Sequence, residues 1–159
     1  MPIGWLEPPI IPSNKLRFLK DADLWDFGML TSRMHVAWLR YIGGRIKSDF
    51  QYSIGIVYNC FPWPNAEERQ KQVVREKAKA VLDARTAHSS ATLADLYDQS
   101  AMPLDLRDAH RSLDREVDRL YRREPFESDR ARVEHLFAMY EVMAAPLMAT
   151  ARQTRKKRR

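Results

Sequence analysis

The sequence predicts an α+β protein that is mostly α-helical, in which a short strand-containing segment precedes a C-terminal helical bundle. From residue 65 onward, apolar residues recur three and four positions apart, as in amphipathic helices. Between residues 45 and 59, apolar and polar residues largely alternate, which is the period of a β-strand. With 45% hydrophobic residues among 159, the chain can bury a core as one domain or as two small units that do not fully separate.

Composition narrows the class of protein. The single cysteine, Cys60, allows no internal disulfide. No apolar run approaches the roughly 20 residues that a membrane-spanning helix needs, and the first residues lack a basic flank followed by an apolar signal core. We therefore expect an intracellular, cytoplasmic protein with no membrane partner.

The net charge of +6 comes from the end of the chain. Residues 152–159 hold six of the 27 basic residues, so the 21 that remain balance the 21 acidic residues. A basic tail of this kind is usually disordered, and we expect residues 151–159 to lack regular structure. Two interpretations stay open: the tail contacts nucleic-acid phosphates without sequence preference, or it only keeps the chain soluble.

The first 30 residues predict extended chain that leads into a short helical approach. Four prolines among the first 12 residues remove backbone donors and interrupt regular structure. The apolar residues around them are too many for a free tail, so we expect this segment to pack in extended pieces against another part of the protein. Residues 23–30 predict a turn or short helix with a large apolar load.

Residues 31–42 predict a helix. Helical spacing places four apolar residues on one face: Met34, Ala37, Trp38 and Tyr41. The pair Gly43 and Gly44 ends the helix in this prediction, because glycine readily takes the left-handed conformation that closes helices.

Residues 45–52 predict one continuous strand with a polar face made of Arg45, Lys47, Asp49 and Gln51. These side chains suit the major groove of DNA: lysine donates to guanine O6 and N7, aspartate accepts from the cytosine amino group, and glutamine pairs with adenine. Arg45 suits a base or a phosphate. The alternative is an exposed strand whose charges only keep it soluble.

Residues 52–59 predict a second strand, because Ile54, Ile56 and Tyr58 alternate with the residues between them. The segment 61–64, Phe-Pro-Trp-Pro, then interrupts the sheet. We interpret it as a linker pinned by buried aromatic residues, and a ligand for a proline-reading domain is the alternative.

Beyond residue 64 the pattern is helical. Asn65 with Glu68 has the spacing of a capping box, and the helix that it opens runs to about Thr86. Thr92 with Asp95 opens a short helix. Further helices are predicted over 104–123 and after residue 128, and the three long helices must bury their apolar stripes together.

Several motifs resemble one protein family, the MmeI-like DNA methyltransferases, which are large single-chain restriction and modification enzymes that methylate adenine. The central motifs are His35-Val-Ala-Trp-Leu-Arg40, Gly44-Arg-Ile-Lys-Ser-Asp-Phe-Gln-Tyr-Ser53, Ile56-Val-Tyr-Asn59 and Phe61-Pro-Trp-Pro64. Further matches lie at Pro2-Ile-Gly-Trp-Leu-Glu7, Ser13-Asn14, Leu93-Ala-Asp-Leu-Tyr97, Met102-Pro103 and Ala109-His110. The resemblance covers roughly residues 2–140.

The resemblance implies a domain organisation and a site. Residues 1–64 resemble the end of a target-recognition domain and residues 65–150 the C-terminal helical domain. In that family, the strand after the Gly-Arg turn chooses base pairs, and the matching positions here are Lys47, Asp49 and Gln51. We expect Arg45 and Arg40 to contact the DNA backbone. Double-stranded DNA and an upstream methyltransferase domain are the implied partners.

We find no catalytic motif in the sequence. The segment Glu7-Pro8-Pro9-Ile10 lacks the amide and the aromatic residue of the motif that holds a flipped base, and the five glycines include no G-x-G cofactor loop. The chain alone is therefore predicted to be inactive, to bind no metal or cofactor, and to leave S-adenosylmethionine to the intact enzyme. A second class stays open: a helical interaction module that docks on the catalytic domains or self-associates, without its own DNA role.

Overall fold

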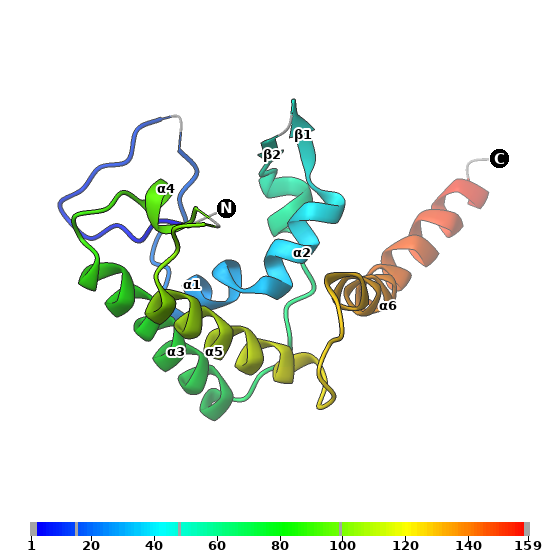
Figure 1. Cartoon of the computed structure of the whole chain (residues 1–159). Coiled ribbons are helices and arrows are strands. Elements are labelled where there is room, and N and C mark those ends of the chain that lie inside the picture. The colour runs from blue at the N-terminus through cyan, green and yellow to red at the C-terminus, as the bar shows by residue number, and fades with distance from the viewer. Residues whose placement is uncertain (1–2, 15, 48, 99, 158–159) are drawn as a thin grey trace. The chain divides into compact units, whose positions relative to one another are not determined.

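The computed structural model describes residues 3–14, 16–47, 49–98 and 100–157, and for Ile46, Asp49 and residues 147–157 it describes the backbone only. Figure 1 shows the elements, which are α1 (Leu24–Thr31), α2 (Arg33–Ile42), β1 (Gly44–Ile46), β2 (Asp49–Gln51), the π-helix η1 (Ile54–Tyr58), α3 (Glu68–Ala87), α4 (Leu93–Leu96), α5 (Leu104–Tyr121) and α6 (Asp129–Lys157). This architecture confirms the predicted fold class, α+β and mostly α.

The chain groups into two compact units. The first contains residues up to 36 together with 65–125, and the second contains 37–64 together with residues from 126 onward. The division runs through α2 and differs from the boundary that the sequence suggested at residue 64. Helix α6 belongs to the second unit, whereas α3 and α5 belong to the first.

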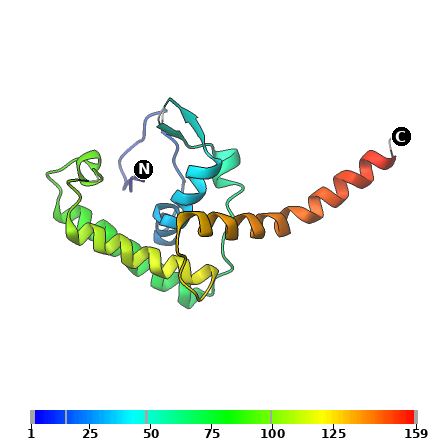
Figure 2. The same cartoon turned by 45° about the vertical axis from the view of Figure 1, so that its right-hand side comes forward.

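The core of the first unit lies where α1 meets α3 and α5. The two long helices run side by side in both ribbon views (Figure 2). A Cβ atom added at Gly28 of α1 would lie 2.9 Å from Val74 Cγ1 and 3.1 Å from Ala78 Cβ, so glycine permits the close approach of α1 to α3. Buried around this contact are Phe27, Met29, Leu30, Val74, Ala78, Val81, Leu106, Leu113 and Val117.

Capping interactions fix where the helices of the first unit begin. Asp23 and Asp26 form a reciprocal capping box at the start of α1, and Thr92 with Asp95 forms the predicted one at α4. At α3 the box is made by Glu67 with Gln70, so the prediction of Asn65 with Glu68 is wrong by two residues.

A buried cation joins three parts of the first unit. Arg85 is 8% exposed, and its guanidinium lies 5.2 Å from the Phe27 ring centroid and 5.0 Å from that of Tyr97. It donates from Nη1 to the Ile3 carbonyl at 2.8 Å and from Nε to the Tyr97 hydroxyl at 2.9 Å. Because the guanidinium only donates, the Tyr97 hydroxyl donates onward to His110 Nε2 at 2.5 Å.

Trp38 organises the second unit. Its ring is 1% exposed and lies 5.3 Å from Phe137 and 6.3 Å from both Phe61 and Tyr140, measured between ring centroids. Its indole N–H donates to the Val57 carbonyl at 3.1 Å. Phe61 is buried, as expected of a linker pinned by aromatic residues.

The prediction of a second strand is wrong. The segment 52–59 forms no second strand: Ile54–Tyr58 is a single π-helical turn. The Val57 carbonyl accepts a hydrogen bond from the Trp38 indole N–H, and the Val57 side chain is buried. These tertiary contacts override the local preference for a strand. Within the basic tail, the backbone of residues 151–157 is helical, because α6 continues to Lys157, whereas we expected no regular structure there; residues 158–159 lie outside the described part of the chain.

Candidate nucleic-acid interface

The predicted polar strand is a β-hairpin. β1 and β2 pair antiparallel, with Gly44 opposite Gln51, Arg45 opposite Phe50 and Ile46 opposite Asp49. Two residues, Lys47 and Ser48, connect the strands, and Ser48 lies outside the described residues. The single continuous strand over 45–52 was therefore a wrong prediction, because the chain reverses direction in the middle of it.

Close backbone approach explains the glycine at position 43, immediately before the hairpin. A Cβ atom at Gly43 would lie 2.4 Å from the Leu39 carbonyl oxygen, to which the Gly43 N–H donates at 2.8 Å. None of the five glycines has a positive φ, so the predicted left-handed helix end is wrong. At Gly44 a Cβ atom would lie 3.4 Å from Gln51 Oε1, which is an ordinary contact distance, so the space at this position does not require glycine.

Lys47 occupies the turn and not a strand face. Its φ of 57° lies in the left-handed region, which is unusual for a residue other than glycine, asparagine or aspartate. Two-residue hairpin turns of types I′ and II′ need a positive φ at their first position, and Lys47 supplies it. The side chain is exposed, so the ammonium stands at the tip of the ribbon.

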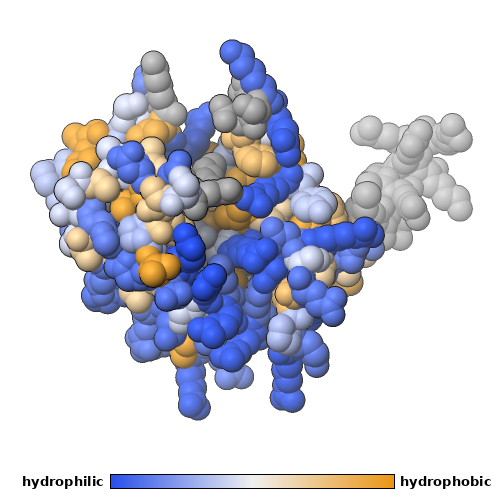
Figure 3. Space-filling view, in the orientation of Figure 1, coloured by the Kyte–Doolittle hydropathy of each residue, from blue (hydrophilic) through white to orange (hydrophobic). Residues whose placement is uncertain are grey.

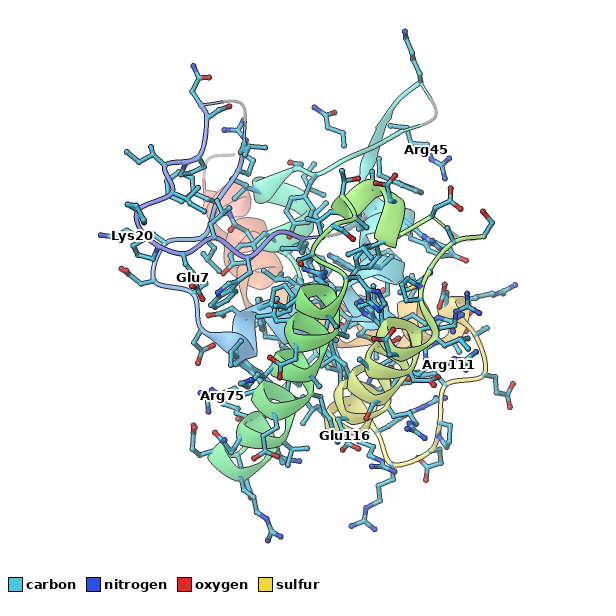
Figure 4. All side chains as sticks on the ribbon, turned by 60° about the vertical axis from the view of Figure 1, so that its left-hand side comes forward. Glu7, Lys20, Arg45, Arg75, Arg111 and Glu116 are labelled. Atoms are coloured by element: carbon cyan, nitrogen blue, oxygen red, sulfur yellow. The ribbon has the colours of Figure 1, made fainter. Side chains whose placement is uncertain are left out.

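The two faces of the ribbon carry different chemistry. Residues opposite each other in an antiparallel pair share a face, and the Arg45 guanidinium lies 4.6 Å above the Phe50 ring. Gln51 belongs to the opposite face and is exposed. Asp49 lies on β2 two residues before Gln51, and its side chain lies outside what the structure describes. Figure 4 shows Arg45 at the hairpin.

The predicted polar row is thus split by the turn. Arg45 does not share a face with Gln51, contrary to the prediction, while Lys47 stands between the strands. Arg40, near the end of α2, is about half exposed, and its Nη1 atom lies 3.6 Å from Asp129 Oδ2. A surface pair of this kind contributes little stability and leaves the guanidinium able to exchange its partner for a phosphate.

Comparisons with known proteins bear on this hairpin directly. Residues 1–65 match the family model described as the MmeI target recognition domain, and residues 66–148 match the model for the MmeI C-terminal domain. The chain belongs to the MmeI-like family of DNA restriction and modification enzymes. The hairpin therefore lies within a target recognition domain.

Two relatives support membership of the MmeI-like family. DNA methyltransferase A of Bacillus subtilis (strain 168) is 41% identical over 143 residues, which are 90% of this chain and 16% of that protein. The solved structure of the Type IIL restriction-modification enzyme MmeI in complex with DNA is 40% identical, with a TM-score of 0.76 over 79% of this chain and 17% of that one. The chain thus spans about one sixth of the length of either relative.

Sequence reasoning missed one cluster that the MmeI-like motifs contain. Tyr97 and His110 belong to the matched segments, and both take part in the buried network of Arg85. Arg85 lies in the last turn of α3, where arginine is ordinary, so its position in the sequence does not indicate burial. Its burial depends on Ile3, 82 residues away, and no local pattern reveals that contact.

Two further findings apply to the described part of the chain. No helix there is long and apolar enough to cross a membrane. Among the same residues, no three His, Cys, Asp or Glu side chains gather as a metal site would require.

Proposed function

We propose that this chain is a DNA-recognition portion of a site-specific DNA adenine methyltransferase from a restriction-modification system. The hairpin of β1 and β2 enters the major groove of duplex DNA, and the helices serve as a scaffold. Methyl transfer from S-adenosylmethionine is assigned to the remainder of the intact enzyme, and the chain alone is expected to transfer no methyl group.

One observation carries the proposal: β1 and β2 form a two-stranded ribbon with an exposed polar side chain at its tip, Lys47, and another on β2, Gln51. The major groove of B-DNA is about 12 Å wide and admits such a ribbon. Lys47 and Gln51 are exposed, as base contacts require. The location of this ribbon in a segment that matches a target recognition domain supports the same function.

Each polar residue has a role that its chemistry defines. Lys47 donates to the acceptors of a guanine, and Asp49 accepts from the cytosine amino group, so the two together read one G·C pair. Gln51 pairs with an adenine. Arg45 and Arg40 contact phosphates, which fixes the register of the ribbon without reading sequence.

Selection from random duplexes tests the proposal. The whole chain is expected to enrich a defined sequence, and Gln51→Ala is expected to relax one position of it, since losing a bidentate contact costs about 1 to 3 kcal/mol of discrimination. Arg45→Gln is expected to weaken binding to all sequences about equally.

A matched control lies on α5. Arg111 is exposed and pairs with Asp108 at 3.4 Å, so Arg111→Gln removes the same charge as Arg45→Gln at a site with no proposed DNA contact. The proposal is contradicted if the chain enriches no sequence, if Gln51→Ala enriches the same sequence as the parent, or if Arg45→Gln weakens binding no more than the control Arg111→Gln does.

A second candidate function rests on exposed apolar side chains of the N-terminal segment. Ile11 is 91% exposed, Phe18 66% and Ile10 60%, and hydrophobic residues interrupt the largely hydrophilic surface in Figure 3. Such residues suit docking onto the rest of a larger methyltransferase, of which this chain matches only a sixth. Self-association of the chain without DNA binding, measured by analytical ultracentrifugation, favours this module over recognition.

A further inference from the structure

We propose that Gly44 is a positioning residue for base reading: because it has no side chain, it leaves the Gln51 amide room to meet the edge of a base. This inference rests on the proposed function, because it requires that Gln51 contacts DNA. It adds to the predicted polar residues a position that acts by being empty.

Packing accounts for two other glycines of the protein but not for Gly44. An added Cβ atom would lie 2.9 Å from Val74 Cγ1 at Gly28 and 2.4 Å from the Leu39 carbonyl oxygen at Gly43. At Gly44 the shortest such distance is 3.4 Å, an ordinary contact. Gly44 has no positive φ either, so an alanine could adopt the same backbone conformation.

A glycine within a strand needs a reason, because it stabilises the strand less than alanine does. Such a glycine often marks a place where a ligand or another backbone comes close. Among the described residues, apart from the chain neighbours of Gly44, only two atoms lie within 4 Å of the added Cβ, and both belong to the Gln51 side chain. Gly44 is exposed, so the space above it is open to a ligand.

Strand pairing places this open position beside the residue proposed to read adenine. Gly44 lies opposite Gln51, and opposite residues share a face of the ribbon. The Cβ and Oε1 atoms of Gln51 lie 3.9 and 3.4 Å from the added Cβ, so the side chain runs alongside the empty position. A branched side chain at residue 44 would occupy the volume that the amide needs when it turns toward a base.

The other face of the ribbon is filled at the neighbouring pair. The Arg45 guanidinium, labelled in Figure 4, lies 4.6 Å above the Phe50 ring. A glutamine that reads adenine must present its amide oxygen and nitrogen together to N6 and N7 of the base. The face that carries Gln51 and the bare Gly44 is therefore the one on which a base edge can come close to the strands.

Open space alone does not carry the inference. Gly4 and Gly55 also have no atom within 4 Å of an added Cβ, but neither is part of the strand pair. Gly55 lies in η1 and is exposed, as Gly44 is. Gly55→Ala is therefore a matched control, because it makes the same chemical change outside the ribbon.

Two variants of the whole chain test the inference by selection from random duplexes and by hydrogen exchange. Gly44→Ala and Gly44→Val should both keep or raise the protection of the β1 and β2 amides, because alanine and valine suit a strand better than glycine. Gly44→Val should reduce the preference at the base position that Gln51→Ala relaxes by about tenfold, which lies within the discrimination that one bidentate contact supplies. Gly44→Val combined with Gln51→Ala should relax that position no further than Gln51→Ala alone, because Gly44 acts through Gln51.

The control Gly55→Ala should retain the base preference of the parent. Loss of amide protection in either Gly44 variant overturns the inference, because glycine would then serve the fold, and additive effects in the double variant overturn it as well. If Gln51→Ala relaxes one position and Gly44→Val relaxes none, the inference fails while the proposed function stands. A parent chain that enriches no sequence contradicts the proposed function and the inference together.

Discussion

At the scale of single residues, Lys47 is the most unusual feature of the hairpin. A lysine with a φ of 57° bears a strain of about 1 kcal/mol relative to its extended or helical conformations. Asparagine tolerates this conformation better, so Lys47→Asn should increase hydrogen-exchange protection of the β1 and β2 amides. The same variant should change the selected DNA sequence, because an amide replaces the ammonium that donates to guanine.

Asp21 provides the control for this prediction. Its φ of 56° is nearly the same, but it lies in the irregular segment before α1. Asp21→Asn should leave hairpin protection and base preference as they are in the parent protein. A Lys47→Asn variant with unaltered base preference would show that the tip of the hairpin does not read DNA.

One buried histidine, His35, and one partly buried histidine, His110, predict how stability depends on pH. Burial lowers the pKa of His35 to about 4, and burial together with the Arg85 guanidinium lowers the pKa of His110 to about 4. Both imidazoles bind protons more readily in the unfolded chain, where the pKa is near 6.5, so the free energy of unfolding should fall as pH drops from 6.5 toward 4. Urea unfolding at pH 6.5 and 4.5 measures this loss.

Variants of the Tyr97 and His110 pair separate titration from hydrogen bonding. His110→Gln removes one titrating group and should reduce the loss of stability between pH 6.5 and 4.5 by on the order of 1 kcal/mol. Tyr97→Phe removes the hydroxyl but keeps the imidazole, so it should lower stability with little change in its pH dependence. Equal pH dependence in the His110→Gln variant and the parent would contradict a neutral, partly buried His110.

At the scale of elements, the sequence predicted most helices and mispredicted the hairpin for a definable reason. Ile46, Phe50 and Tyr52 keep the two-residue spacing of one strand across the polar run from Lys47 to Asp49, and the turn lacks the Asn-Gly or Asp-Gly pair that marks hairpins. A prediction from periodicity alone therefore joined β1 and β2 into one continuous strand. The following turn at Ile54–Tyr58 was mispredicted because its β-branched residues favour strands, whereas the bond from Trp38 to Val57 is a tertiary contact.

The glycine that ends α2 gives a prediction at this scale. Gly43→Ala places a Cβ atom 2.4 Å from the Leu39 carbonyl, so the variant should lose about 1 to 3 kcal/mol in the free energy of unfolding. Gly55→Ala in η1 meets no atom within 4 Å and should be neutral or slightly stabilising. Similar stability for both variants in thermal unfolding would contradict the close backbone approach at Gly43.

At the scale of the whole molecule, residues of the two matched family domains pack against each other within one compact unit. Within the first compact unit, Arg75 Nε lies 3.0 Å from Asp23 Oδ2, and Asp114 Oδ1 accepts from the Arg33 amide at 2.7 Å. Arg85 likewise donates to Ile3. Each contact joins a residue before 65 to one after it, and Figure 4 labels Arg75 on α3. The boundary at residue 64 is thus a boundary of sequence families, and packing crosses it.

Truncation tests this packing. A chain of residues 1–65 would expose Phe27, Gly28 and Met29, which are buried in the intact protein, and it should show the NMR spectrum of a largely unfolded polypeptide. The complete chain is the control and should give dispersed resonances. A well-dispersed spectrum from residues 1–65 alone would contradict the account of α1 as part of a shared core.

The central claim is that the hairpin chooses base pairs, and an intact relative tests it most directly. Exchanging the residues aligned with Lys47 and Asp49, then sequencing the methylated sites, gives the base preference at every position of the target. The account predicts a changed preference at one base pair with the other positions retained. Methylation of the parental site, unchanged at every position, would contradict it.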